Sequence, residues 1–369
     1  MNRGLSRRTL LIAALAAAST RAFAQGSPSF SLPIDSDELS LISTARINGE
    51  SVFVMIDNGA AYTMADAAFG GRIPSAMSPR VLAPTLPAIE LGGLMRLQPR
   101  ALIDLSSVSI GNERPVAALI GMDLFQAGTV DLDFVAKTLT LRSAGLSPPE
   151  GARAVDLRPD PGLKHAVELS IEGGPPFQAW LDLGSAHALL LKPALADKLG
   201  LNDARTPSTR LATGATSDGR RADFTHRTGS VRQLRFAGRD IPDVPFEVGD
   251  FASATADALL GLPVLRKFGL RFDLASDQLW ASDTPRFAEP FVRDLIGLQA
   301  GPTRRGLTVI HAAKASPAAA AGFTAGETIA TINGDPASLK GLRIQEPGRY
   351  VDFTLIDGAK RNLTTARFD

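Results

Sequence analysis

The chain has 369 residues, of which 44% are hydrophobic and 21% are charged. These values are typical of two or three compact domains and exclude a disordered chain, which needs low hydrophobicity and a high net charge. The chain has no cysteine, so disulfide frameworks, thiolate zinc sites and a cysteine nucleophile are excluded. The formal net charge is only +1, which gives no reason to expect a nucleic acid as partner.

Residues 1–24 have the layout of a bacterial secretory signal peptide. Basic residues come first, residues 10–18 are apolar, and residues 22–24 read Ala-Phe-Ala, a typical cleavage pattern. The paired Arg7 and Arg8 match the twin-arginine export signal. A membrane anchor is the alternative, but the apolar run is about half of the roughly 20 residues that span a bilayer. We expect a periplasmic or secreted protein without a permanent membrane anchor.

Short runs of alternating or β-branched apolar residues dominate the rest of the chain, separated by Gly, Pro, Asp and Asn. This pattern predicts a mainly all-β fold. Two stretches rich in proline and glycine, at residues 143–153 and 284–297, are expected to be linkers. They divide the chain into segments 29–142, 154–283 and 298–369.

An internal repeat connects the first two of these segments. Each contains an apolar run that ends in Asp-x-Gly, at Asp57 and at Asp182. Each then has an apolar pair followed by glycine, at Gly121 and at Gly261, and two further matched blocks in the same order. Such a repeat predicts two homologous halves related by a pseudo-two-fold axis. One residue from each half would then meet at this axis.

Two aspartates that meet in this way can perform acid–base chemistry. Carboxylates about 3 Å apart cannot both ionise cheaply, so Asp57 and Asp182 would share one proton. The ionised member can take a proton from water while the protonated member donates to a carbonyl oxygen. Gly59 and Gly184 would permit the close approach of a second backbone. The alternative interpretation is that each Asp-x-Gly is simply a turn.

At these residues the sequence resembles the bacterial retropepsin-like and pepsin-like aspartic proteases. The resemblance covers residues 29–282 and implies two β-barrel lobes, 29–142 and 154–283, with the catalytic pair Asp57 and Asp182 between them. It also implies supporting roles at the strand that passes beside each aspartate and at the turn that follows it. The supporting residues are Asn58, Gly59, Gly121, Gly184, Ser185 and Gly261.

The residue after each aspartate departs from the family pattern. The family has Thr or Ser there, and its hydroxyl bonds across to the other lobe, whereas this chain has Asn58 and Leu183. Asn58 can supply a polar side chain and Leu183 cannot. Ser185 matches the pepsin type, and a hydrogen bond from its hydroxyl would make Asp182 the more ionised member of the pair.

Hairpins that close over an extended peptide are also implied by the resemblance. In the second half, residues 212–219 form a turn-rich tip with Thr213 and Gly214 as candidate substrate-binding residues. In the first half the candidate region is residues 77–93, which lacks a clear hairpin turn. Surface loops without a binding role are the alternative for both regions.

Residues 298–369 resemble a small α+β PDZ domain of the type found in bacterial secreted proteases. Residues 316–322 read as a short helix with a Ser cap, and Asn333-Gly334 as a hairpin turn. Gly306 and Leu307 occupy the position of the loop that binds a peptide carboxylate in that family. Only the short stretch 336–347 stands where the second helix should follow, so a packing module is the alternative interpretation.

The sequence therefore predicts an exported aspartic endopeptidase that acts on a peptide or protein, with the PDZ-like domain positioning the substrate. A catalytically inactive peptide-binding protein on the same fold is the alternative, because of Asn58 and Leu183. None of the four histidines shows the spacing of a known metal motif, and no dinucleotide fingerprint is present. We expect neither a metal nor a cofactor.

Overall fold

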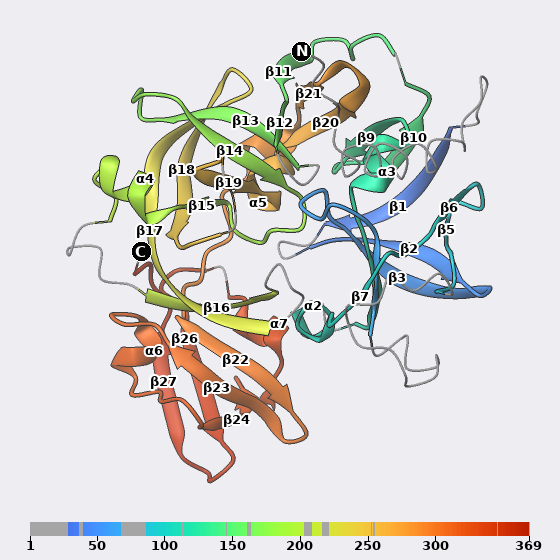
Figure 1. Ribbon diagram of the computed structural model, residues 1–369. Helices are drawn as coiled ribbons and strands as arrows, with labels where there is room; N and C mark the ends of the chain where they lie inside the picture. The colour runs from blue at the N-terminus through green and yellow to red at the C-terminus, as the bar shows by residue number, and fades with distance from the viewer. Residues whose placement is uncertain are drawn as a thin grey trace, which may run out of the picture.

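The computed structural model is mainly β, as the sequence predicts, and its sheets curl into barrel-like units followed by a smaller C-terminal sheet (Figure 1). The expected signal segment lies outside the described residues, and the described helices include none that is long and apolar enough to cross a membrane. The structure describes residues 29–36, 40–67, 86–111, 114–144, 146–160, 164–202, 209–215, 221–251, 253, 255–344 and 346–368.

The first half of the chain is built from short strands that alternate between buried and exposed side chains or are buried throughout. Its elements are β1 (Phe30–Ser36), β2 (Leu41–Ile47), β3 (Glu50–Ile56), β4 (Met64–Asp66), β5 (Ile89–Leu91), β6 (Met95–Leu97), β7 (Leu102–Ile103), α2 (Ser106–Gly111), β8 (Val116–Ile120), α3 (Met122–Gln126), β9 (Thr129–Asp133) and β10 (Thr138–Arg142).

The second half has longer strands and a long hairpin. Its elements are β11 (Arg153–Asp156), β12 (Arg158–Asp160), β13 (Lys164–Ile171), β14 (Phe177–Asp182), β15 (Leu189–Leu191), α4 (Pro193–Lys198), β16 (Thr209–Ala215), β17 (Arg221–Phe236), β18 (Arg239–Val248), β19 (Ala258–Gly261), α5 (Leu262–Leu265), β20 (Phe268–Asp273), η3 (Leu274–Ser276), β21 (Gln278–Asp283) and η4 (Pro285–Ala288).

The two halves repeat one local topology around the candidate aspartates. In the first half, β3 pairs in parallel with β8, and β8 pairs antiparallel with β4. In the second half, β14 pairs in parallel with β19, and β19 pairs antiparallel with β15. The central strand is apolar and fully buried in each case, because it is covered on both faces. The matched sequence blocks thus correspond to matched strands.

One continuous sheet joins the halves. Strand β9 of the first half pairs antiparallel with β20 of the second, and the sheet runs in the order β11-β21-β20-β9-β10-β1. Asp131 lies opposite Arg271 in this register, and two guanidinium nitrogens bond its carboxylate at 2.5 and 3.0 Å. Buried apolar residues from both halves form one contiguous core. The halves are therefore packed as one body.

The C-terminal segment forms its own sheet and its own core (Figure 1). The Oγ atom of Ser316 caps α6 by accepting from the N–H of Ala319, as the sequence predicts for a short helix, and Ser338 caps α7 in the same way. The sheet order is β22-β23-β24-β26-β27, with β25 beside β24. The elements are β22 (Leu298–Thr303), β23 (Gly306–Ala312), α6 (Pro317–Ala320), β24 (Thr328–Ile332), β25 (Asp335–Pro336), α7 (Leu339–Leu342), β26 (Tyr350–Leu355) and β27 (Lys360–Thr364).

Arginines tie the two ends of this C-terminal domain back to the second half. Arg293 precedes the domain and donates to the Ser230 hydroxyl at 2.7 Å. Arg367 follows the last strand of the domain and bonds the same hydroxyl at 3.0 Å and the Asp243 carboxylate at 3.1 Å. Both contacts lie on the β17–β18 hairpin, so the domain is anchored to the half that carries Asp182.

Replacing Arg271 with alanine should lower the free energy of unfolding by about 2–3 kcal/mol, because a bidentate, largely buried pair is lost and Asp131 remains. Arg142 is the matched control, since its guanidinium bonds the same carboxylate from a site that is 44% exposed. Arg142→Ala should cost less than about 1 kcal/mol. Urea denaturation followed by tryptophan fluorescence measures both, because Trp180 and Trp280 lie in the second half. Equal losses would contradict a special role for the pair.

Candidate active site

Strand ends place the two aspartates at the centre of the joined halves. Asp57 directly follows β3, and its backbone N–H donates to the carbonyl of Ile120 on β8 at 2.9 Å. Asp182 is the last residue of β14 and lies opposite Gly261 of β19. Each carboxyl group is therefore fixed by two parallel strands, and each keeps partial exposure to solvent.

The two Asp-x-Gly turns cross at close range. The N–H of Gly59 donates to Asp57 Oδ1 at 2.7 Å, and the N–H of Gly184 donates to Asp182 Oδ1 at 2.9 Å. A methyl group on Gly59 would lie 2.6 Å from the carboxyl carbon of Asp182, and one on Gly184 only 2.3 Å from that of Asp57. Glycine is thus required at both positions by the approach of the opposite aspartate.

The carboxyl groups of this crossed pair act on each other. Burial raises the pKa of Asp57 well above the usual value of 3.8, and the charge of Asp182 and a hydrogen bond with it raise it further. The Gly59 N–H and the Lys164 ammonium oppose this rise without cancelling it. A raised pKa of this origin is what two close carboxyl groups that share a proton require.

Asn58 supplies the cross-link between the halves. Its side-chain carbonyl accepts from the backbone N–H of Leu183 at 2.7 Å, and its amide donates to the backbone carbonyl of Leu181 at 3.2 Å. Asn58 is 3% exposed, so both bonds are shielded from water. Leu183 takes part through its backbone alone, and its side chain is fully buried in the core. The Asn58 amide thus links the turn after Asp57 to the backbone on both sides of Asp182.

Gly121 and Gly261 lie where the resemblance implies, on the strand ends beside the two aspartates. A methyl group on Gly121 would come within 2.4 Å of the Tyr62 backbone, and one on Gly261 within 2.0 Å of the His187 carbonyl oxygen. The N–H of Gly261 donates to the Ala188 carbonyl at 3.2 Å. Both glycines therefore let a turn pack directly against the strand.

Ser185 stabilises the turn that follows Asp182. Its hydroxyl accepts from the backbone N–H of His187 at 3.2 Å, and its carbonyl accepts from the N–H of Leu262 at 3.0 Å. The hydrogen bond expected from Ser185 to Asp182 is not among those formed by the described residues. The greater ionisation of Asp182 stays a prediction, with support from the raised pKa of Asp57.

In the first half, the turn after the aspartate is stabilised by Thr63 and Asp123, a pair that the sequence analysis missed. Thr63 is fully buried, and its hydroxyl donates to Asp123 at 2.6 Å and accepts from the N–H of Gly121 at 3.2 Å. Burial raises the pKa of Asp123, and the hydrogen bonds from Thr63 oppose that rise. The two residues are 60 positions apart, so no local pattern signals their contact.

Strands β16 and β17 form a hairpin in the region where the sequence analysis expects one in the second half, and a substrate-binding role for it stays a prediction. Thr213 lies opposite Asp223 and Gly214 opposite Ala222. The tip at residues 216–220 lies outside the described residues, as does most of the first-half candidate region. The expectation that residues 77–93 lack a hairpin turn is wrong at its end, because β5 and β6 pair around a turn at Gly92.

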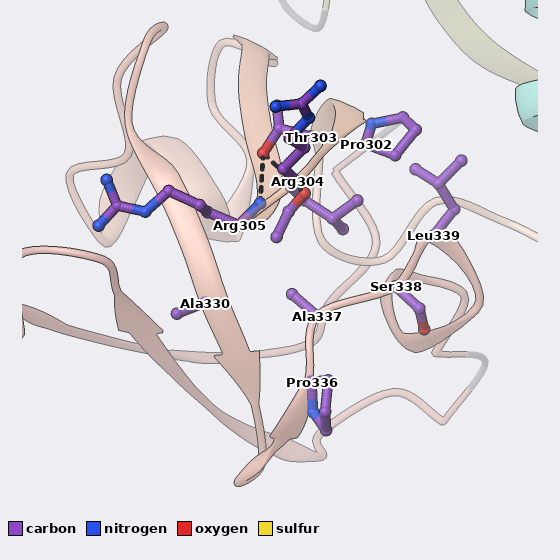
Figure 2. Close-up of a pocket in the computed structure, with 11 residues that line it drawn as sticks. Pro302, Thr303, Arg304, Arg305, Ala330, Pro336, Ala337, Ser338 and Leu339 are labelled. Atoms are coloured by element: carbon purple, nitrogen blue, oxygen red, sulfur yellow. Dashed lines mark hydrogen bonds between the residues drawn. The ribbon is translucent and has the colours of Figure 1, made fainter.

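A groove of about 500 Å³ lies in the C-terminal domain, at the loop between β22 and β23 (Figure 2). Gly306 and Leu307 line it, and α7 begins on the opposite side. Gly306 has φ +135°, and a methyl group there would lie 2.0 Å from the Ile329 carbonyl oxygen. The other lining residues are Pro302, Thr303, Arg304, Arg305, Ala330, Pro336, Ala337, Ser338 and Leu339.

Two comparisons with known proteins find similarities to this chain. A sequence model described as aspartyl protease matches residues 167–264, which include Asp182 and Gly261. Among solved structures, the aspartic proteinase from Irpex lacteus is similar, with a TM-score of 0.43 and 12% identity over 71% of this chain and 99% of that one. A search of curated proteins finds no match. The matched segment carries β14, β19 and β15, the strands that surround Asp182.

Replacing Asn58 with alanine should lower the free energy of unfolding by about 2–4 kcal/mol, because two buried backbone groups lose their partner. The exposed Asn362 is the control, and its alanine variant should change stability by no more than about 0.5 kcal/mol. Denaturation followed by tryptophan fluorescence compares the two variants. If Asn58→Ala is no less stable than Asn362→Ala, the amide does not hold the halves together.

Proposed function

We propose that this chain is an exported aspartic endopeptidase whose catalytic pair is Asp57 and Asp182. The observation that carries the proposal is the crossing of the two Asp-x-Gly turns, which brings the two carboxyl groups together at a partly exposed position. The aspartyl-protease match to residues 167–264 supports it. The bonds of Asn58 support it further, because they replace the missing Thr or Ser contacts.

The reaction follows from the two protonation states. A water molecule between the carboxyl groups loses a proton to ionised Asp182 and attacks the peptide carbonyl carbon, while Asp57 donates its proton to the carbonyl oxygen. When the tetrahedral intermediate collapses, its hydroxyl returns a proton to Asp57 and Asp182 protonates the leaving amine. Both carboxyl groups are then restored, and one water has been added across the peptide bond.

Asp57→Asn and Asp182→Asn should each lower kcat/KM for peptide cleavage by about 10²–10⁴-fold, since each removes one acid–base partner. Asp335→Asn is the matched control, because Asp335 is an exposed aspartate in β25, and it should retain activity. A mixed peptide library analysed by mass spectrometry identifies the cleavage. Cleavage that survives in both site variants would overturn the assignment of the pair. Retention of peptides by the folded protein without any cleavage would instead support the inactive peptide-binding alternative.

The pH profile of the same reaction provides a second readout. Activity needs one protonated and one ionised carboxyl, so kcat/KM should rise and then fall with pH. The fall reflects loss of the Asp57 proton, and burial and the Asp182 charge raise the pKa of that group. The alkaline limb should therefore lie above the ordinary aspartate value of 3.8.

Export and peptide capture complete the proposal. The basic and apolar pattern of residues 1–24 supports twin-arginine export to the periplasm or the medium. The groove beside Gly306 supports a PDZ-like role in which the free C-terminus of a substrate binds next to strand β23. The partner is then a protein or peptide that ends in an apolar residue, since the groove includes Leu307 and Leu339.

Replacing Ala337 with tryptophan should fill this groove and weaken peptide binding at least about tenfold, a loss of roughly 1.4 kcal/mol. Fluorescence anisotropy with a labelled peptide that ends in a free apolar residue measures the affinity. Ala325→Trp is the control, because Ala325 is exposed in the same domain and does not line the groove. Equal binding of the carboxylate peptide and its C-terminal amide would contradict the PDZ-like role.

A further inference from the structure

His187, His226 and Glu247 form a cluster outside the aspartate pair. His187 Nδ1 lies 2.9 Å from Glu247 Oε1, and His226 Nδ1 lies 2.8 Å from Oε2 of the same carboxylate. One ligand atom from each of the three residues lies within 4.8 Å of the others. Two imidazoles and a carboxylate are the ligand set that zinc and related divalent metals take in sites with one open position.

Three separate elements of the second half bring these side chains together. His187 is in the turn after Asp182, His226 is on β17 opposite Arg210, and Glu247 is on β18 opposite Leu190. Because β15 and β17 both pair with β18, Glu247 stands between the two histidines. No short sequence motif indicates the cluster, because His187 and His226 are 39 residues apart and His226 and Glu247 are 21 apart.

The surroundings hold the ligands in place and leave one side open. The His226 and Glu247 side chains are 5% and 12% exposed, whereas that of His187 is 24% exposed. The His226 ring packs against Gly249, where a methyl group would come within 2.5 Å of Nε2. A buried backbone contact of this kind fixes the ring, and solvent reaches the cluster from the His187 side.

The spacing of the cluster can be compared with that of a metal site. Bonds of about 2.0–2.1 Å in a tetrahedral zinc site place neighbouring ligand atoms about 3.3 Å apart. The distances of 2.9 and 2.8 Å run to different oxygens of Glu247. The three ligand atoms, which lie within 4.8 Å of one another, would therefore have to move to this separation around one oxygen. Each neutral imidazole would bind the ion through its unprotonated nitrogen and keep its single proton on the other ring nitrogen. Metal binding would then release no proton from either histidine.

We propose that His187, His226 and Glu247 bind one divalent transition-metal ion of the zinc type, with solvent as the fourth ligand. The ion would connect the turn that follows Asp182 to β17, at the base of the β16–β17 hairpin. This inference concerns metal binding by the second half and stands whether or not the aspartate pair cleaves peptides.

Titration of Co²⁺ into the full, metal-free chain without a polyhistidine tag tests the proposal. We expect one equivalent to bind with the visible absorption of four-coordinate Co²⁺, and Zn²⁺ to displace it. Glu247→Gln and His187→Asn should weaken binding by at least 10–100-fold, since outer-shell changes alone cost about that much. Glu247→Gln keeps the size of the side chain, and tryptophan fluorescence checks that each variant is folded.

His311→Asn is the matched control, because His311 lies on β23 in the C-terminal domain, and it should leave affinity and stoichiometry unchanged. Failure of the folded chain to bind Co²⁺ stoichiometrically would overturn the proposal. Binding that survives in Glu247→Gln but is lost in Asp182→Asn would also overturn it, because the ion would then occupy the aspartate pair. Slower hydrogen exchange at residues 226–230 on adding Zn²⁺ would further support a metal ion that connects β17 to the turn after Asp182.

Discussion

The contact between the carboxyl groups of Asp57 and Asp182 is the constraint on which the rest of the structure depends. Two strand ends from different halves must stay within van der Waals distance, although their side chains repel each other when both are ionised. The shared β9–β20 sheet and the Asn58 amide supply the restoring contacts. Because the native state binds the Asp57 proton more tightly than the unfolded chain does, the free energy of unfolding falls as pH rises through the pKa of native Asp57. The close approach of the two carboxyl groups thus lowers stability, and the β9–β20 pairing and the Asn58 hydrogen bonds offset that loss.

Features that depend on local pattern could be predicted from the sequence. Buried strands appear as apolar runs, and the two Asp-x-Gly turns stand at the ends of such runs, so the mainly β fold and the position of each aspartate follow directly. The glycines of these turns allow a close approach, but the group that approaches is a side chain and not the expected backbone. Neither Gly59 nor Gly184 has a positive φ, and what excludes a side chain is the carboxyl group of the opposite aspartate. The repeated glycine therefore reflects the contact of each turn with the aspartate of the other half.

Contacts between residues far apart in the chain could not be predicted in the same way. Thr63 with Asp123, Arg271 with Asp131, and His226 with Glu247 depend on sheet register, which no short motif encodes. The histidine cluster shows this most clearly, since each ligand taken alone reads as an ordinary polar residue on a strand or turn. Knowledge of the pairing of β17 and β18 with their neighbours turns three isolated residues into one site.

The difference between Asn58 and Leu183 shows what a fused pair of halves permits. In a symmetric dimer the two positions would carry the same residue, and each side chain would face the backbone of the opposite half. In this chain Asn58 forms the cross-link from one side, through the Leu183 N–H and the Leu181 carbonyl. Leu183 then contributes to the shared core, with none of its surface exposed. Leu183 thus adds apolar packing where a symmetric pattern would have a second polar contact. The two turns still cross.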